Sequence, residues 1–404
     1  MSFGIPVRNG LGIGLLASTS LATRNRSFSP ALLFAANEPG GWYDPSDLST
    51  MFQDRAGTTP VTATGQTVGL VLDKSRGLAL GSELVTNGTF DTGLTGWTVG
   101  TDPAQVIPTW SNGQVSLARG AGGNGGFLQT FTTGPDKSYW LSFTVVSVSS
   151  GSTAVSLGGT VTVVAGTGNF RLLIPRAAAN SAGIQFWPSS TNATIVIDNV
   201  SVKELAGNHL TQATLANRPI YQVDGTGRGY LLFDGSDDFF VSPTITPGID
   251  KAQVFAGVRK LSDATAAFVM ETSSAVSANT GAIAFCAPAH AGANYYFETR
   301  GTTTAITITR NIFAAPTTNV VTSIGDIAAD TAIIRVDGTQ EGTSVADQGT
   351  GNYLAHPMFV GRRGGTSSPF NGRIYSLIVR FGANLTATQI AQTEAWVNSK
   401  TGAY

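Results

Sequence analysis

The chain has a single cysteine, Cys286, among its 404 residues. An intrachain disulfide is therefore excluded, and stability has to come from core packing or from oligomerisation. Cys286 stands in the apolar run Ala284-Phe285-Cys286-Ala287. Such a setting predicts a buried, unreactive thiol rather than a catalytic nucleophile.

Charge is also scarce. Lys, Arg, Asp and Glu make up 12% of the residues, and the formal net charge is -1. Charged residues are roughly a quarter of an ordinary globular protein. A net charge this small provides no broad field for nucleic acid or an anionic membrane. No stretch reaches the roughly 18 apolar residues that cross a bilayer. We therefore expect neither nucleic-acid binding nor membrane insertion.

An apolar stretch at residues 11–21 has the composition of a secretory signal but not its flanks. One Arg precedes it, whereas Arg24 and Arg26 follow it, and Met1 is retained. Small and apolar residues alternate there, as they do in a strand added to another sheet. We expect an arm that packs against neighbouring subunits.

Catalytic patterns are missing too. Glycoside hydrolysis needs two carboxylates across a cleft, and the sequence has no Glu-x-Asp-x-x-Glu strand. None of the three histidines lies beside a Gly-x-Ser-x-Gly elbow, and there is no Gly-rich phosphate loop or Cys/His metal cluster. The sequence predicts that the protein is not an enzyme. The remaining candidate carboxylates are expected to be solvated or at turns: Glu271, Glu298, Glu341 and Glu394.

Glycine is abundant, at 49 residues, and Thr, Ser, Ala and Val fill much of the remaining sequence. β-Branched side chains suit a pleated surface, glycine supplies turns with positive φ, and the usual helix builders Leu, Lys and Glu are sparse. The length allows two or three domains. We predict an all-β fold in which two antiparallel β-sandwich (jelly-roll) domains follow an extended N-terminal segment.

One helix is expected at the C-terminus. Thr386 is a typical N-cap, and Gln389 completes a capping box with it. Leu385 and Ile390 have the spacing of a hydrophobic staple, and Gly402 marks the end.

The first region, residues 1–81, contains the run GGWYDPSDLSTMFQD at residues 40–54. Pro39 and the Gly40-Gly41 pair are expected to break regular structure there. This run resembles a segment near the start of tailed-bacteriophage virion proteins. The resemblance implies that the region anchors the chain to the particle. Its candidate anchoring residues are Trp42, Tyr43, Asp44 and Phe52. An ordinary small core, or a turn-rich cap on the next domain, is the alternative.

The second region, residues 82–206, opens with ELVTNGTFD and closes with ATIVIDNVSVK. Between them, Tyr139, Leu141, Phe143 and Val145 alternate on one face of a predicted strand. The two ends resemble carbohydrate-binding modules of the jelly-roll type.

Sugar binding by such a module uses aromatic platforms, because pyranose C–H bonds meet the negative face of the ring. Trp110 and Trp187 lie beside turns and are the candidate platforms, with core packing as the alternative. The resemblance also implies a structural calcium ion between the opening and closing strands, although no cofactor is required. Glu83 and Asp198 are its candidate ligands, unless they accept backbone N–H bonds instead.

The third region, residues 207–404, has a Phe-Asp-Gly turn at residues 233–235 and a second Asp-Gly turn at Asp337-Gly338, both typical of hairpins. Near the end, residues 370–379 predict a strongly buried strand. This order, with the capped terminal helix, resembles the concanavalin-A-like or laminin-G-like sandwich. Candidate carbohydrate contacts on its sheet or rim are Tyr295, Tyr296 and Arg362, and inter-subunit packing is the alternative.

Together these resemblances predict a structural virion protein at the surface of a phage particle, synthesised in the host cytoplasm. The expected role is a tail fibre or spike-type appendage that adheres to host surface polysaccharide and contacts other virion proteins, as a homotrimer. One alternative is a capsid decoration or head-fibre protein without essential glycan binding. A second is a polysaccharide depolymerase, and a third is a secreted bacterial adhesin.

Overall fold

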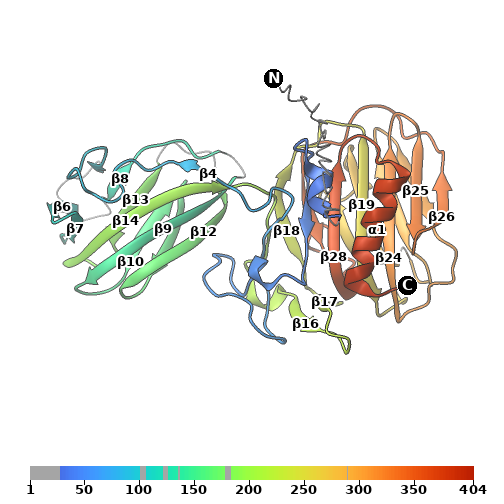
Figure 1. Cartoon of the computed structure of the whole chain (residues 1–404), viewed down its shortest axis with the longest axis horizontal. Helices are drawn as coiled ribbons and strands as arrows, with labels where there is room; N and C mark the ends of the chain where they lie inside the picture. Colours follow the sequence, from blue (N-terminus) through green and yellow to red (C-terminus); the bar gives the residue numbers. More distant parts are fainter. Residues whose placement is uncertain (1–27, 101–105, 122–125, 135–136, 178–182, 289) are drawn as a thin grey trace, which may run out of the picture.

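The computed structural model describes residues 28–100, 106–121, 126–134, 137–177, 183–288 and 290–404. The expected arm at residues 11–21 lies outside them. The prediction of an all-β fold with one C-terminal helix is confirmed. Figure 1 shows two β-sandwiches side by side, a small one and a large one. None of the helices in the described ranges is long and apolar enough to span a membrane.

The small sandwich contains a six-stranded and a five-stranded antiparallel sheet. The six-stranded sheet comprises β12 (Gly168–Ala177), β9 (Lys137–Val148), β14 (Ala193–Leu205), β7 (Gln114–Arg119) and β6 (Val106–Ser111), with β4 (Leu80–Glu83) pairing β14. The five-stranded sheet comprises β11 (Thr160–Val164), β10 (Thr153–Leu157), β13 (Ile184–Pro188), β8 (Phe127–Gln129) and β5 (Thr98–Val99).

The core of the small sandwich forms where the inner faces of its two sheets meet. Tyr139, Leu141, Phe143 and Val145 of β9 are all buried in it, as their alternation predicts. Trp97 stacks on Phe127, with ring centroids 4.9 Å apart, so this tryptophan has a structural role.

The large sandwich contains an eight-stranded and a nine-stranded sheet. The eight-stranded sheet comprises β16 (Ile220–Val223), β17 (Gly229–Asp234), β28 (Asn371–Phe381), β19 (Lys251–Lys260), β24 (Thr317–Asp326), β25 (Thr331–Val336) and β26 (Thr339–Ser344), with β1 (Gly40–Tyr43) pairing β28. The nine-stranded sheet comprises β2 (Met51–Phe52), β3 (Leu70–Val71), β15 (Leu210–Thr211), β18 (Phe240–Ile245), β27 (His356–Val360), β20 (Phe268–Thr272), β21 (Ala282–Cys286), β22 (Tyr296–Arg300) and β23 (Thr304–Ile308).

Within the described ranges, four helical segments complete the fold. Three are short 3-10 helices: η1 (Pro30–Phe34), η2 (Leu48–Thr50) and η3 (Leu215–Asn217). The fourth, α1 (Ala387–Thr401), covers the outer face of the eight-stranded sheet (Figure 1). The predicted capping box between Thr386 and Gln389 is present, and Gly402 ends the helix in the left-handed conformation.

Strands β1, β2 and β3 of the first region belong to the sheets of the large sandwich, so the described part of residues 1–81 does not form a separate anchoring region. Gly40 pairs with Arg380 and Tyr43 with Leu377, more than 300 residues later in the chain. Gly40 and Gly41 therefore lie inside a strand, where a break was expected. A Cβ on Gly40 would stand 1.9 Å from the carbonyl oxygen of Val379, so only glycine fits at this close approach.

The two Asp-Gly turns of the third region differ in outcome. Asp337-Gly338 joins β25 and β26, which pair as the predicted hairpin. Asp234-Gly235 follows β17, but β17 and the next strand, β18, enter different sheets. The turn is therefore a crossover from one layer of the sandwich to the other.

Candidate functional site

Three of the four residues expected to anchor the chain are buried inside the large sandwich. Trp42 packs edge to face on Trp396 of α1, with ring centroids 5.4 Å apart. The Tyr43 hydroxyl donates to the carbonyl of Asn208 over 2.5 Å, and Asp44 pairs with Lys74. Each side chain is at most 7% exposed. The expectation of an exposed docking surface here is wrong, because these side chains fill the interior of the fold.

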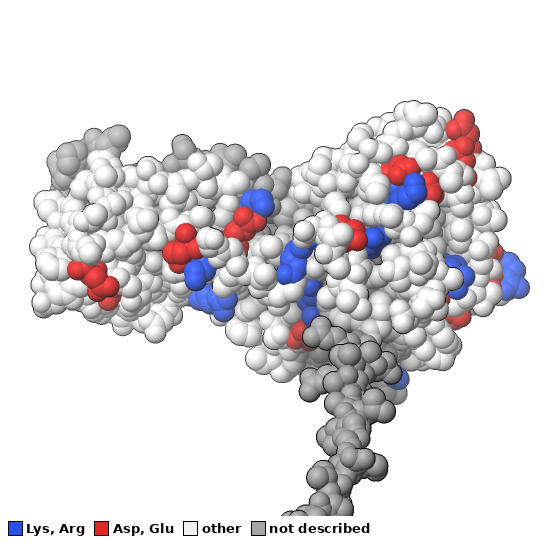
Figure 2. Space-filling model, turned by 45° about the horizontal axis from the view of Figure 1, so that its top comes forward, with Lys and Arg blue, Asp and Glu red and all other residues white. Residues whose placement is uncertain are grey.

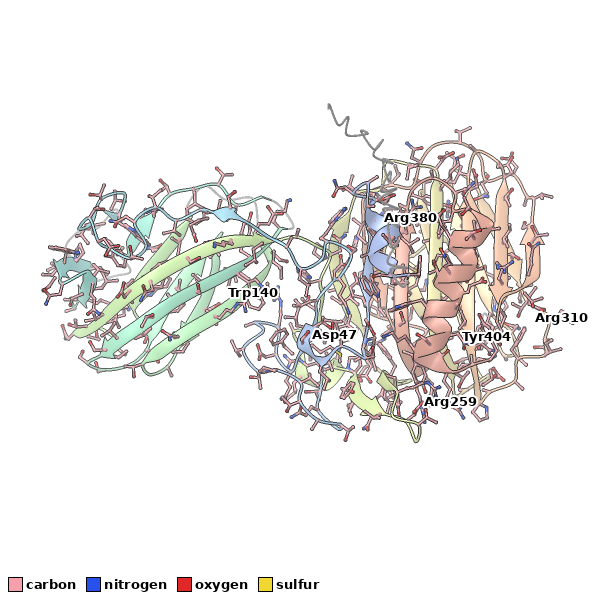
Figure 3. All side chains as sticks on the ribbon, viewed as in Figure 1. Asp47, Trp140, Arg259, Arg310, Arg380 and Tyr404 are labelled. Carbon is pink, nitrogen blue, oxygen red and sulfur yellow. The ribbon has the colours of Figure 1, made fainter. Side chains whose placement is uncertain are left out.

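Phe52, the fourth residue, lies at the junction between the sandwiches. It packs on Trp140 of β9, with ring centroids 6.3 Å apart. Figure 3 places Trp140 at the end of the small sandwich that faces the large one. The surrounding cluster holds residues of both: Leu70, Leu72, Leu173 and Leu205. This apolar junction holds the two sandwiches against each other.

The two candidate sugar platforms of the small sandwich differ in exposure. Trp110 on β6 is 44% exposed, and its indole N–H donates to the carbonyl of Phe90 over 2.7 Å. Trp187 on β13 is partly buried and packs against the core. Trp110 and Trp187 lie on different sheets of the small sandwich, β6 and β13, and do not form one platform.

Among the candidates of the third region, Tyr295 is fully buried and donates a hydrogen bond to Asn319. It is a core residue, so its prediction as a carbohydrate contact is wrong. Tyr296, the first residue of β22, faces the opposite side of the sheet and donates to Glu298 over 3.3 Å. Arg362 is partly exposed and donates to the carbonyl of Thr366.

The proposed calcium ligands are engaged in other contacts. Glu83 accepts hydrogen bonds from the Val202 N–H (2.7 Å) and the Ser201 hydroxyl (2.5 Å), and Asp198 accepts from the Asn199 N–H. Within the described ranges, the carboxylates that do cluster are those of Asp234, Asp237 and Asp238 at the crossover turn. Because backbone N–H groups of the same turn donate to Asp234 and Asp238, the turn itself accounts for that cluster.

The outer face of the nine-stranded sheet, opposite the core, carries one continuous row of cross-strand neighbours. In strand order the row is Phe52, Leu70, Thr211, Val241, Phe359, Glu271, Ala284, Glu298 and Ile306. Residues opposite one another in a sheet share a face. The small sandwich covers the Phe52 end of the row, and two glutamates stand near the other end.

These two glutamates are not the solvated side chains that the sequence suggested. Glu271 is 0% exposed and Glu298 is 8% exposed. Burial raises the pKa of Glu271 to about 7, and burial also raises the pKa of Glu298. The Arg363 guanidinium lies 3.9 Å from Glu271, and the backbone N–H of Val276 donates to the same carboxylate oxygen.

Cys286 lies close to this pair and is 1% exposed, as predicted. Burial raises the pKa of its thiol, and the nearby Glu271 and Glu298 raise it further. A neutral, covered thiol of this kind is a poor nucleophile.

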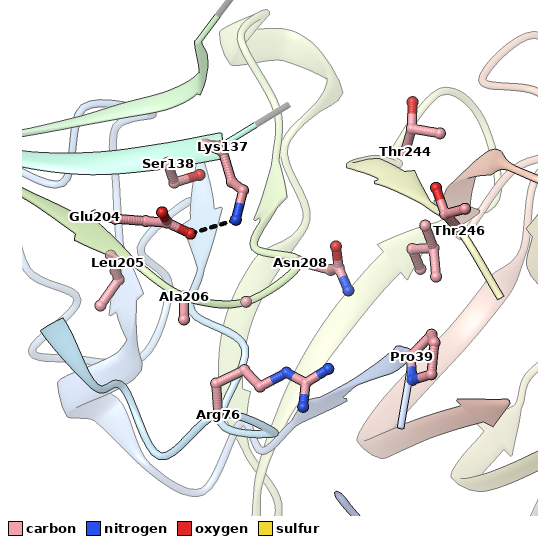
Figure 4. A pocket seen from close by; sticks show the side chains of 12 residues that line it. Pro39, Arg76, Lys137, Ser138, Glu204, Leu205, Ala206, Asn208, Thr244 and Thr246 are labelled. Carbon is pink, nitrogen blue, oxygen red and sulfur yellow. Dashed lines mark hydrogen bonds and ion pairs between the residues drawn. The ribbon is translucent and has the colours of Figure 1, made fainter. Parts of the chain in front are cut away.

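A polar pocket of about 370 Å³ opens at the junction (Figure 4), and we call it the junction pocket. The small sandwich contributes Lys137, Ser138 and Glu204, and the large one contributes residues 244–246. The connecting residues 205–208 and two residues of the first region, Pro39 and Arg76, complete its lining.

Polar groups in the junction pocket are held by specific contacts. Lys137 and Glu204 form an ion pair of 2.6 Å, and Arg76 donates to the carbonyls of Asn37 and Glu38. The hydroxyl of Ser138 is buried and has no hydrogen-bond partner among the residues that the structure describes. A pocket with fixed polar groups and an unsatisfied hydroxyl suits a polar, uncharged ligand rich in hydroxyl groups.

Sequence reasoning did not find this pocket. Its lining comes from five separate segments that local patterns do not relate, and none of its residues stands in a motif. The period of two along β22 does place Tyr296, Glu298 and Arg300 on one face. No sequence signal, however, pairs that face with Glu271 and Arg363.

Neither a family model nor a curated protein matches the chain. Among solved structures, the CBM40 of the Ruminococcus gnavus IT-sialidase, bound to alpha2,3 sialyllactose, is 15% identical over 43% of this chain and 94% of its own, with a TM-score of 0.31. The receptor binding domain of botulinum neurotoxin D is 9% identical over 45% of this chain and 49% of its own, with a TM-score of 0.32. At such values the likeness carries no inference about the ligands or the role of this chain.

Proposed function

We propose that the chain is a non-enzymatic structural protein of a tailed-phage particle, in a tail fibre or spike-type appendage that adheres to host surface glycans. The junction pocket is the proposed glycan site, and the observation that carries this proposal is its lining. Both sandwiches supply polar groups to one cavity, beside the buried Ser138, whose hydroxyl has no partner in the described part of the chain. Sugar hydroxyls both donate and accept hydrogen bonds, so they match a lining of this kind.

The virion part of the proposal rests on the sequence. Residues 40–54 resemble a segment of phage virion proteins. That resemblance is one of sequence, so it supports the same family even though the segment is buried in the fold. Charged side chains are few and scattered on the face shown in Figure 2, as expected of a surface without a strong field. A homotrimer would multiply weak sugar contacts, since effective concentration raises avidity by roughly 10² to 10⁴.

Binding of the whole chain to a glycan array tests the proposal. Thr246 is exposed and lines the junction pocket, so Thr246→Trp should fill the cavity without disturbing a core. Val345→Trp is the matched control, because Val345 is 78% exposed and does not line the pocket. We expect Thr246→Trp to abolish the glycan signal and Val345→Trp to preserve it. Absence of any glycan signal from the unsubstituted chain contradicts the proposal.

The first alternative is a capsid decoration protein, which would also be part of the phage particle but would lie on the head instead of the tail. Immunogold labelling of phage particles distinguishes the two, because a tail appendage is labelled at the tail and a decoration protein over the head.

The second alternative is a polysaccharide depolymerase, and the Glu271–Glu298 pair is the feature that favours it. Glu271 on β20 and Glu298 on β22 each pair with Ala284 on the strand between them, β21. The strands that carry the two glutamates are therefore about 10 Å apart. Inverting glycosidases hold their carboxyl groups roughly 6.5–9.5 Å apart. Complete burial of Glu271 argues against contact with substrate. New reducing ends from host capsule, lost in Glu271→Gln, would establish this alternative.

A further inference from the structure

A second cavity lies on the outer face of the six-stranded sheet of the small sandwich, and we call it the cationic cavity. It has a volume of about 240 Å³ and is lined by Leu80, Trp140, Ser142, Arg171, Ser201 and Lys203. The strand register explains how these side chains come together. Ser142 of β9 stands between Arg171 of β12 and Ser201 of β14, and Trp140 is opposite Lys203.

Two cations in this lining lack an anionic partner. The guanidinium of Arg171 lies over the Trp140 ring, 4.1 Å from its centroid. Within the described part of the chain, neither Arg171 nor Lys203 makes a side-chain hydrogen bond or an ion pair. Other lysines of this charge-poor chain do have anionic partners: Lys74, Lys137, Lys251, Lys260 and Lys400.

Neighbouring carboxylates offset only part of the charge of the cationic cavity. Glu83 is the cross-strand neighbour of Lys203 and accepts hydrogen bonds from Val202 and Ser201, so it holds one negative charge against the two cations. Glu204 is paired with Lys137 over 2.6 Å. No Asp or Glu is part of the lining. The cavity therefore presents two positive charges and two serines between apolar walls, and an anionic group is what would balance it.

We propose that the cationic cavity binds the carboxylate of an acidic sugar residue, such as a uronate, within the host glycan. The planar fork of Arg171 matches a carboxylate in two-bond geometry, and Lys203 supplies a second charge. Ser142 and Ser201 are placed to contact sugar hydroxyls. Leu80, which is 47% exposed, offers an apolar contact to the C–H bonds of the ring, while Trp140 supports the guanidinium of Arg171 from below. The volume is below the roughly 300–1,000 Å³ of pockets for drug-sized ligands, so it suits one sugar unit.

A polyanion such as nucleic acid fits less well. The cavity supplies only two cations, and the protein as a whole has a net charge of -1, so it cannot neutralise a run of phosphates. An acidic polysaccharide carries one carboxylate on each sugar unit, which a single small cavity with two cations can accommodate. This inference rests on the proposed adhesion to glycans and adds the chemical class of the glycan.

Calorimetric titration of the whole chain with three probes tests the inference: an oligogalacturonate, the same oligomer as its neutral methyl ester, and inorganic sulfate. We expect the oligogalacturonate to bind at least tenfold more tightly than its methyl ester. Loss of a charge-assisted hydrogen bond corresponds to roughly a tenfold weakening or more. Arg171→Gln and Lys203→Gln should each weaken oligogalacturonate binding by this factor. The matched control Arg310→Gln should leave binding unchanged, because Arg310 is exposed and pairs with Glu341.

Each other outcome has a defined meaning. Equal binding of acid and ester, unaffected by Arg171→Gln and Lys203→Gln, overturns this inference and leaves the proposed glycan adhesion in place. Absence of binding by both oligomers overturns this inference, and a blank glycan array for the same chain is what overturns the proposed adhesion. Binding of sulfate as tightly as the oligogalacturonate overturns the assignment to a sugar, because the cavity then selects only for negative charge.

Discussion

Phe52 and Trp140 pack edge to face with ring centroids 6.3 Å apart, although one belongs to the large sandwich and the other to the small one. A Cβ on Gly57 would stand 3.1 Å from the same indole ring, so the segment after Phe52 also approaches Trp140 closely. In addition, the backbone N–H of Leu173 donates to the carbonyl of Ala56 over 2.6 Å. These contacts make the two sandwiches one unit around the junction pocket.

Removing the Trp140 ring should separate the two sandwiches. Truncating a buried aromatic side chain to alanine costs about 3–5 kcal/mol. Because Trp140 faces the junction and not the core of the small sandwich, we expect Trp140→Ala to leave both sandwiches folded. Small-angle X-ray scattering should give a larger radius of gyration for this variant, and Trp110→Ala, with its half-exposed ring, serves as the control. An unchanged radius for Trp140→Ala would show that the ring does not hold the junction.

Deleting residues 1–81 should unfold the large sandwich. The deletion removes β1, which pairs β28, and it removes core residues including Tyr43, Met51 and Val71. We expect the calorimetric transition of the large sandwich to disappear while that of the small one remains. Deletion of residues 1–27 is the control and should preserve both transitions. A detachable anchor predicts instead that both transitions survive the longer deletion.

Glu271 should make stability depend on pH. Burial raises its pKa from the ordinary 4.5 to about 7, so the folded chain binds this proton more tightly than the unfolded chain does. Its contribution is fully present below about 4.5 and is lost as the pH rises through about 7. In Glu271→Gln, which stays neutral, the decline in the free energy of unfolding across this window should be smaller by about 3 kcal/mol.

Urea unfolding at pH 4.5 to 8 measures this difference. Glu341→Gln is the control, because hydrogen bonding to Arg310 lowers the pKa of Glu341 and its contribution should not fall over the same window. Parallel curves for the unsubstituted chain and Glu271→Gln would contradict the assignment.

The N-cap of α1 should contribute measurably to the large sandwich. The Thr386 side chain accepts a hydrogen bond from the Gln389 N–H, and the Gln389 side chain accepts one from the Thr386 N–H. Thr386→Ala should cost about 1 kcal/mol of unfolding free energy, and Thr386→Ser should cost much less. Equal losses in the two variants, measured by thermal unfolding, would mean that the hydroxyl does not act as a cap.

The features that were predicted correctly depend on residues that are close together in the sequence. The capping box of α1 depends on residues three apart, and the buried face of β9 follows from a period of two. The hairpin at Asp337-Gly338 likewise depends on the φ preference of two residues. In each case the interacting groups are close in sequence, so the pattern is sufficient.

Features that depend on distant pairing were not predictable in this way. Gly40-Gly41 has the composition of a break, but its neighbour in space is β28, and close approach to Val379 is what requires glycine. Burial of Tyr295 rather than Tyr296 depends on which face of β22 meets the other sheet. The junction pocket depends on how the two sandwiches meet, and the cationic cavity depends on which strands of the six-stranded sheet are neighbours. No local pattern records either.

Hydrogen exchange of the whole chain, with and without the strongest glycan from the array, tests the central claim most directly. If the sandwiches bind glycan at their junction, added protection should appear in residues 137–142, 201–208 and 244–246, which line the junction pocket and the cationic cavity. Protection confined to residues 106–111 and 184–188, around Trp110 and Trp187, would instead place binding on the small sandwich alone and contradict the account.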